Sequence, residues 1–101
     1  MTIKETNYYT EWVEGLRDPR AIAHIERRVR RLASGNPGDV KPVGEGVSEL
    51  RIHYGPGYRV YFKQFGNVVV VLLIGGDKST QRHDIELAKG IANELEKGNS
   101  K

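Results

Sequence analysis

The chain has 101 residues, of which 38% are hydrophobic and 29% are charged, and it contains no cysteine. This length and composition predict one soluble globular domain over residues 1–101, and the lack of cysteine excludes disulfides and thiolate metal sites. The formal net charge of +3 is compatible with an anionic partner but does not require one. Residues 68–74 form the longest apolar run, which is too short to span a bilayer, and residues 1–12 lack an apolar signal-peptide core. We therefore expect a cytoplasmic protein with no membrane partner.

The first third of the chain predicts a strand and two helices. Residues 3–9 are expected to form the strand, and residues 10–16 a short helix. Asp18 can cap a second helix with Pro19 in its first turn, and Gly35 is placed to end it. Apolar residues at spacings of three and four give this helix one buried stripe: Ile22, Ile25, Val29 and Leu32.

The opposite side of the second predicted helix is strongly basic. Two interpretations stay open, a solvated helix surface or a patch that contacts phosphates, and Glu26 is the acid that offsets the charge nearby. The basic side comprises Arg20, His24, Arg27, Arg28, Arg30 and Arg31.

Residues 48–64 alternate as a β-hairpin, after an expected edge strand at residues 39–44. Successive strand residues point to opposite sides of a sheet, so each parity set lines one surface. With Gly55-Pro56-Gly57 as a three-residue loop, the polar surface would pair His53 with Arg59, Arg51 with Tyr61, and Glu49 with Lys63.

The last third predicts an apolar strand and a final helix. Residues 68–74 lack alternation, which is typical of a strand covered on both sides, the second cover being the final helix or a partner chain. Ser79 or Thr80 can cap that helix, and residues 97–101 are expected to fray. The order β-α-α-β-β-β-β-α predicts an α+β fold, a small twisted and mostly antiparallel sheet with helices segregated on one side.

The stretches "GNPGDVKPVGEGVSELRI", "GPGYRVYF" and "VVLLIGGDKSTQRHDIELAK", with Tyr9 and Trp12 before them, resemble the RelE/ParE toxin superfamily. More closely, the chain resembles its phage-derived, HigB-like branch of addiction module killer proteins. The resemblance implies a RelE-like fold with an N-terminal helical hairpin and a C-terminal helix. It also implies a toxin of a type II toxin–antitoxin module, neutralised by a small antitoxin that often carries a helix-turn-helix DNA-binding domain.

The activity implied by the resemblance divides between branches. RelE-type and HigB-type toxins cut mRNA on the ribosome without metal or cofactor, whereas ParE-type toxins share the fold and poison DNA gyrase. A third possibility is an inactive relative that only binds RNA or antitoxin. The fold alone does not decide among these activities.

The resemblance also implies roles for individual residues. Arg59 matches the catalytic arginine of RelE toxins, and Lys78 lies where they carry a phosphate-binding base. Val47 and Glu49 stand in place of a RelE lysine pair, and Asp84 in place of a tyrosine, so the RelE mechanism does not transfer intact. HigB-like toxins use histidine, acidic and aromatic residues, which adds these candidates: His53, His83, Asp84 and Tyr61.

The residues themselves suit metal-free cleavage of RNA. Such cleavage needs an acid, a base and positive charge near the phosphate. Arg51 and Arg59 could hold the phosphate, and Arg59 has no acid opposite it in the predicted hairpin. His53 could accept a proton or be a half-exposed strand residue, Tyr61 could stack on a base, and Arg51 could instead pair with Glu49. The predicted catalytic set is Arg59, His53, Lys78 and Asp84, and the predicted RNA-binding set is Arg51, Tyr61, Lys63 and His83. The histidine spacing does not suggest a metal site.

Overall fold

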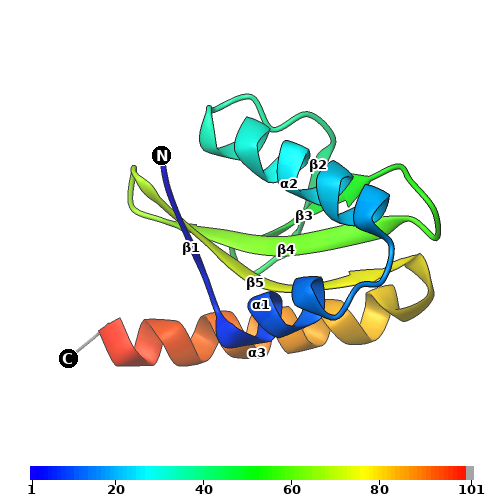
Figure 1. The fold of residues 1–101 in the computed structure, drawn as a ribbon. Helices are drawn as coiled ribbons and strands as arrows, with labels where there is room; N and C mark the ends of the chain where they lie inside the picture. The colour runs from blue at the N-terminus through cyan, green and yellow to red at the C-terminus, as the bar shows by residue number, and fades with distance from the viewer. Residues whose placement is uncertain (100–101) are drawn as a thin grey trace.

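The computed structural model describes residues 1–99, and its element order confirms the predicted one (Figure 1). A short 3-10 helix, η1, joins the last strand to the last helix. The elements are β1 (Thr2–Glu5), α1 (Asn7–Glu14), α2 (Pro19–Ala33), β2 (Val40–Gly44), β3 (Val47–Ile52), β4 (Tyr58–Phe65), β5 (Val69–Asp77), η1 (Lys78–Thr80) and α3 (Gln81–Asn99).

All five strands form one sheet in the order β1-β5-β4-β3-β2. The β2–β3, β3–β4 and β4–β5 pairs are antiparallel, and β1 pairs with β5 in parallel. The sheet is therefore mixed and mostly antiparallel, which agrees with the predicted α+β class.

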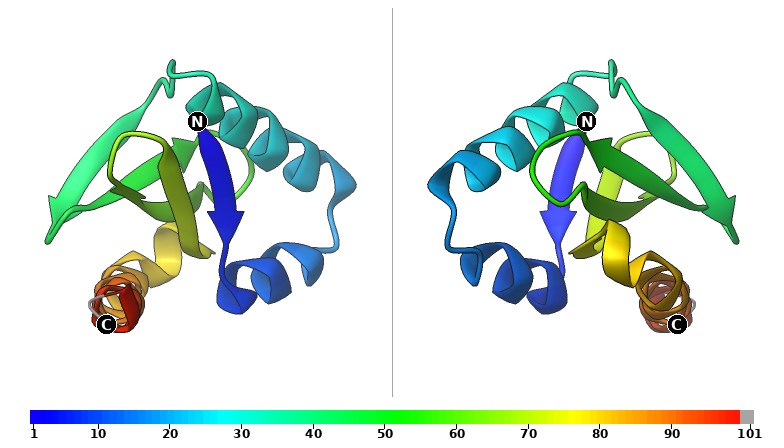
Figure 2. Two further views of the ribbon diagram at one scale, coloured as in Figure 1. Left: turned by 90° about the vertical axis from the view of Figure 1, so that its left-hand side faces the viewer. Right: turned by 90° about the vertical axis from the view of Figure 1, so that its right-hand side faces the viewer.

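Helices cover both faces of the sheet, so the prediction that they lie on one side is wrong. Figure 2 shows α1 and α2 on one side of the sheet and α3 on the other. One buried cluster, which includes Tyr9, Ile25 and Leu50, lies on the α1/α2 side, and a second, which includes Tyr61 and Ala88, lies beneath α3. The apolar run in β5 explains this arrangement, because its residues supply both clusters. Within residues 1–99, no helix combines the length and apolar content needed to cross a bilayer.

The first strand is shorter, and the first helix earlier, than the sequence predicted. The strand predicted over residues 3–9 ends at Glu5, since Thr6 caps α1 by accepting a hydrogen bond from the Tyr9 N–H at 3.1 Å. The Asp18 cap of α2 is confirmed by a 2.9 Å bond from the Arg20 N–H. At the other end, α3 continues to Asn99. The expected fraying of residues 97–101 stays a prediction, and residues 100–101 lie outside the described part of the chain.

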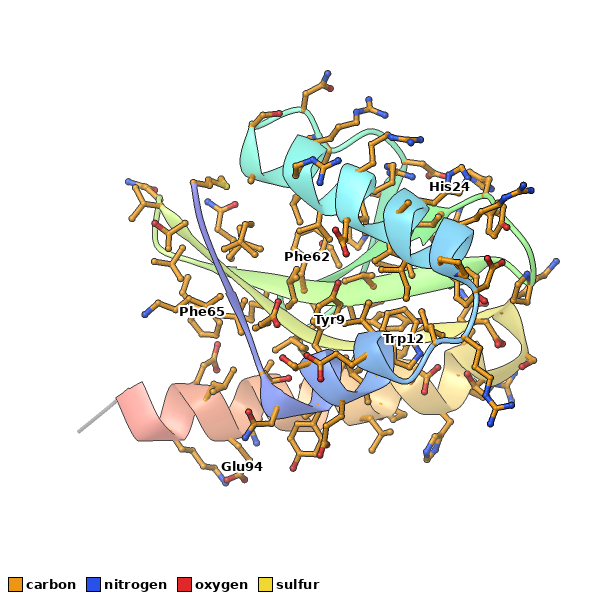
Figure 3. All side chains as sticks on the ribbon, in the orientation of Figure 1. Tyr9, Trp12, His24, Phe62, Phe65 and Glu94 are labelled. Atoms are coloured by element: carbon orange, nitrogen blue, oxygen red, sulfur yellow. The ribbon has the colours of Figure 1, made fainter. Side chains whose placement is uncertain are left out.

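Tyr9 and Trp12 project from α1 into the core (Figure 3), with ring centroids 5.9 Å apart. Trp12 lies directly over Gly75, where a Cβ atom would come within 2.1 Å of the indole ring. The first glycine of the Gly75-Gly76 pair therefore makes room for a core aromatic, which a sequence pattern alone did not indicate.

The β3–β4 hairpin has a longer loop than predicted. Ile52 pairs with Tyr58, so the loop covers residues 53–57, and the predicted register is wrong by two residues. Tyr54 leaves the strand because its ring stacks on His24, with centroids 4.4 Å apart, and its hydroxyl donates to Asp18 at 2.9 Å. A shift of two keeps every side chain on its predicted face but changes its cross-strand partners.

Candidate functional site

A buried carboxylate, Glu49, organises the polar surface of β3 and β4 on the α3 side of the sheet. One oxygen accepts from Arg51 Nε and Arg59 Nη1, both at 3.1 Å. The other accepts from the Tyr61 hydroxyl at 3.2 Å and from Gln81 Nε2 at 2.8 Å. Two further residues, Asp39 and His53, extend these contacts from Arg51. We call the whole set the Glu49 network: Asp39, Glu49, Arg51, His53, Arg59, Tyr61 and Gln81.

The strand register brings these groups together. Glu49 and Arg51 are two residues apart on β3 and therefore share a face. Across the hairpin, Arg51 pairs with Arg59 and Glu49 pairs with Tyr61. Gln81 opens α3, and its bond to Glu49 ties the start of that helix to the sheet. The predicted pairs His53–Arg59, Arg51–Tyr61 and Glu49–Lys63 are not formed.

The network has a buried end. Glu49 is fully buried, and the Arg59 side chain is 13% exposed. Burial alone would raise the pKa of Glu49, but hydrogen bonds from Gln81 and Arg51 and the charge of Arg59 outweigh it and hold that pKa below its usual value. Arg51, not an acid, lies opposite Arg59, as expected, but Arg59 is not free of an acidic partner, because the shifted register places Glu49 within reach.

The network also has an exposed end. His53 Nε2 lies 2.5 Å from Asp39 Oδ2, and the imidazole is 75% exposed. Asp39 lies 3.9 Å from Arg51 Nη1, and the Arg51 side chain is 30% exposed. The bond with His53, with a further contribution from the Arg51 charge, lowers the pKa of the Asp39 carboxyl. An imidazole and a guanidinium, each oriented by a carboxylate, therefore lie close together at the surface.

Tyr61 does not offer a stacking surface, and the prediction that it stacks on a nucleobase is wrong for this structure. Its side chain is fully buried beneath α3, and its hydroxyl donates to Glu49. Burial, with the neighbouring Glu49 charge, raises the pKa of the phenol well above its usual value. Tyr61 is thus a neutral donor that supports the carboxylate.

Two other predicted residues border the network. Lys78 is exposed beside the hairpin loop, since a Cβ atom on Gly57 would lie 3.5 Å from the Lys78 Cβ. Asp84 is buried, accepts a 2.5 Å hydrogen bond from Thr80, and lies over Gly76, the cross-strand neighbour of Arg59. Its burial and its position behind Arg59 place it away from solvent.

The remaining two predicted residues lie elsewhere. Lys63 pairs with Glu96, in the C-terminal half of α3, and donates to the Glu45 carbonyl in the β2–β3 turn. His83 is exposed on α3, two residues after Gln81. Two helical residues correspond to a rotation of roughly 200°, so His83 faces away from the network.

Sequence reasoning missed Asp39 and Gln81 as members of the site. It placed Glu49 on the polar surface opposite Lys63, and the alternative that it left open, a pair between Arg51 and Glu49, is confirmed. The shared parity of Glu49 with Arg51 was a usable signal, but the shorter predicted loop assigned Glu49 to Lys63. Asp39 becomes a partner because its carbonyl accepts from the Arg51 N–H at 3.0 Å, which fixes the chain beside β3. No local pattern marks Gln81, since its role depends on how α3 crosses the sheet.

The donor set suits proton transfer and anion binding better than metal binding. Within residues 1–99, no three His, Asp or Glu side chains gather in a way that could hold a metal ion. The formal charges of Arg51 and Arg59 balance those of Asp39 and Glu49, so the network provides directed hydrogen-bond donors without a large net charge.

The chain has a close relative of matching length. A Haemophilus influenzae protein described as uncharacterized is 52% identical over 93 residues, which cover 92% of this chain and 94% of the relative. The two chains belong to one family. No protein-family model matches the chain. No solved structure matches it either. The matched segment spans nearly the whole of both chains.

Proposed function

We propose that this protein is the toxin of a type II toxin–antitoxin module and that it cleaves mRNA on the ribosome without a metal ion. The observation that carries the proposal is the exposed end of the Glu49 network, where His53 and Arg51 lie side by side, each held by a carboxylate. The resemblance to RelE/ParE toxins, and to the HigB-like branch in particular, supports the same activity. The toxin would act in the cytoplasm, and a cognate antitoxin with a helix-turn-helix domain would neutralise it.

The chemistry follows from these two side chains. His53 accepts the proton of an RNA 2′-hydroxyl while Asp39 orients the imidazole, as a carboxylate does in other acid–base pairs. The 2′-oxygen then bonds to the phosphorus, the bond to the 5′-oxygen breaks, and a proton from Lys78 reaches the departing oxygen. The products are a 2′,3′-cyclic phosphate and a 5′-hydroxyl. Arg51 donates to the phosphate as negative charge accumulates on it.

A basic helix surface adjoins this end of the network and supports an RNA substrate. The Arg28 guanidinium binds the carbonyl oxygens of Arg51, Pro37 and Asp39. Burial, with the neighbouring Arg31 charge, lowers the pKa of Arg28. Arg27 and Arg31 are exposed on the same side of α2, which extends positive charge from the site along the helix.

A second candidate is a toxin that acts by binding alone, as ParE-type toxins act on gyrase. The specific observation in its favour is that Arg59 and Tyr61, two residues expected to contact RNA, are instead committed to a buried carboxylate. On this alternative the Glu49 network only stabilises the fold, and a different surface binds the target.

Induction of the protein in growing bacteria without a partner tests the proposal. We expect growth arrest with loss of methionine incorporation within minutes, and His53→Ala and Arg51→Ala should relieve it while remaining folded by circular dichroism. Arg30→Ala is the matched control. The sequence grouped Arg30 with the basic side of this helix, but the structure places it with Glu26 and Val13 around a hollow on the α1 side of α2, so this variant should stay toxic. Filamentation with intact translation would favour the binding-only toxin, and absence of any growth defect would contradict both.

A further inference from the structure

An apolar groove runs between α3 and the β1 edge of the sheet. It has a volume of about 1110 Å³ and is lined by residues of β1, the start of α1, β5 and α3. Val71, Ile74 and Ile91 supply its apolar surface. Two large side chains at its border are unusually exposed for their type, Tyr8 at 59% and Leu87 at 41%. Phe65 and Glu94 mark the part of the groove near the C-terminal half of α3 (Figure 3).

The groove exists because α3 covers the sheet unequally. The helix is tied to β3 through Gln81 and to the β2–β3 turn through Lys89, which lies 3.7 Å from Glu45. On β5, by contrast, Val69, Val71 and Ile74 are only partly buried, whereas Val70, Leu72 and Leu73 are buried. One face of an apolar strand is thus left partly without cover on the side of α3 remote from the Glu49 network.

The charge around the groove is opposite to that of the whole protein. Its lining contains three carboxylates, Glu5, Glu86 and Glu94, against one ammonium, Lys4, a formal charge of −2 in a chain of +3. Glu94 also lies 3.8 Å from Lys97, but both side chains are more than two-thirds exposed, and water weakens such pairs. An apolar floor with an acidic border is complementary to an apolar stripe flanked by basic residues.

We propose that this groove binds an amphipathic helix of a separate protein, with its apolar side against β5 and α3 and its lysines or arginines against Glu5, Glu86 and Glu94. Helix-in-groove recognition uses apolar residues at helical spacing, and the groove offers a floor for one such stripe. A second copy of this chain is a poor occupant. The basic helix α2 buries its own apolar side, Ala21, Ile25 and Leu32, in the core. The inference does not depend on the proposed activity, because the groove and the Glu49 network lie on opposite sides of α3.

Binding of designed peptides to the purified full chain tests this inference. The probe is a fluorescein-labelled helix of roughly 18 residues, with leucines at i, i+3, i+4 and i+7 and flanking lysines. Two control peptides keep either the leucines with flanking glutamates or the same composition in scrambled order. We expect the lysine-flanked helix to bind at least about tenfold more tightly than either control by fluorescence anisotropy.

Two protein variants locate the binding. Leu87→Lys places a positive charge at the exposed apolar border of the groove. This variant should bind the lysine-flanked helix about tenfold more weakly. Val68→Lys is the matched control, because Val68 is 62% exposed at the β4–β5 turn and does not line the groove, so binding should stay unchanged. Equal binding of all three peptides, or equal loss in both variants, would overturn the proposal. So would a concentration-dependent dimer in sedimentation that Leu87→Lys dissociates, because a second copy would then occupy the groove.

Discussion

The two ends of the Glu49 network contain the same kinds of groups in opposite environments. At the buried end, Glu49 fixes Arg59 and Tyr61 beneath α3, and little of any of them meets solvent. At the exposed end, Asp39 orients His53 and approaches Arg51 in contact with water. Pairs of a carboxylate with a basic group therefore occur in this molecule in two different environments, one buried and one exposed.

Because they differ in burial, the two ends of the network have different roles. A buried charge without its partner is costly, so the buried end contributes to the integrity of the fold. An exposed pair contributes little to stability, so the exposed end is free to bind and react. Variants at the buried end should lower the stability of the fold, whereas variants at the exposed end should lower toxicity and leave stability unchanged.

The largest expected effect is on stability, at the buried end. Glu49→Ala leaves Arg59, Arg51 and the Tyr61 hydroxyl without their shared acceptor and should cost about 3–5 kcal/mol of unfolding free energy. Urea unfolding followed by circular dichroism measures it. Glu11→Gln, at an exposed position of α1, should change stability by less than about 0.5 kcal/mol. A similar small change for both variants would remove the distinction between the ends.

A smaller loss is expected where Asp84 lies behind Arg59. A Cβ atom on Gly76 would come within 1.9 Å of the Asp84 carboxylate, so Gly76→Ala must displace that side chain from its place beneath α3. We expect a loss of about 1–3 kcal/mol, by thermal unfolding. Gly90→Ala in α3 meets no atom within 4 Å, and it should instead stabilise the protein by about 0.5–1 kcal/mol.

The acid limb of the stability curve should depend on the same carboxylate. Because the folded-state pKa of Glu49 lies below its unfolded value of about 4.3, its contribution is complete above that pH and is lost as pH falls through the folded pKa. Melting temperatures between pH 3 and pH 7 measure this. Glu49→Gln should flatten the acid limb relative to the native chain. An unchanged slope would show that Glu49 does not hold its proton differently in the folded state.

The smallest stability effect is expected at the exposed end. Asp39→Asn should leave the unfolding free energy unchanged within error, because the pair with His53 lies in water. The same variant should reduce toxicity on induction, since His53 would lose the group that orients it. Destabilisation of Asp39→Asn comparable to that of Glu49→Ala would show that both ends are structural.

Local signals were sufficient for much of the fold. The order of strands and helices, the Asp18 cap and the two faces of the hairpin follow from capping residues and from the periods of 2 and 3.6. The register did not follow, because the length of the loop is set by tertiary contacts of Tyr54 with His24 and Asp18. Parity therefore predicted which residues share the polar face, and it allowed a pair between Glu49 and Arg51, but the predicted register gave no contact between Glu49 and Arg59. Gln81 could not be predicted, since only the path of α3 brings it to Glu49.

The chemistry of the RNA ends is the most direct test of the proposed activity. Transcripts collected shortly after induction would be sequenced for 2′,3′-cyclic phosphate and 5′-hydroxyl termini, in the native chain and in His53→Ala. We predict new termini within coding regions that disappear in His53→Ala at equal protein levels. Undiminished termini in that variant, or none in the native chain while cells are arrested, would contradict the assignment of the exposed end as the site of cleavage.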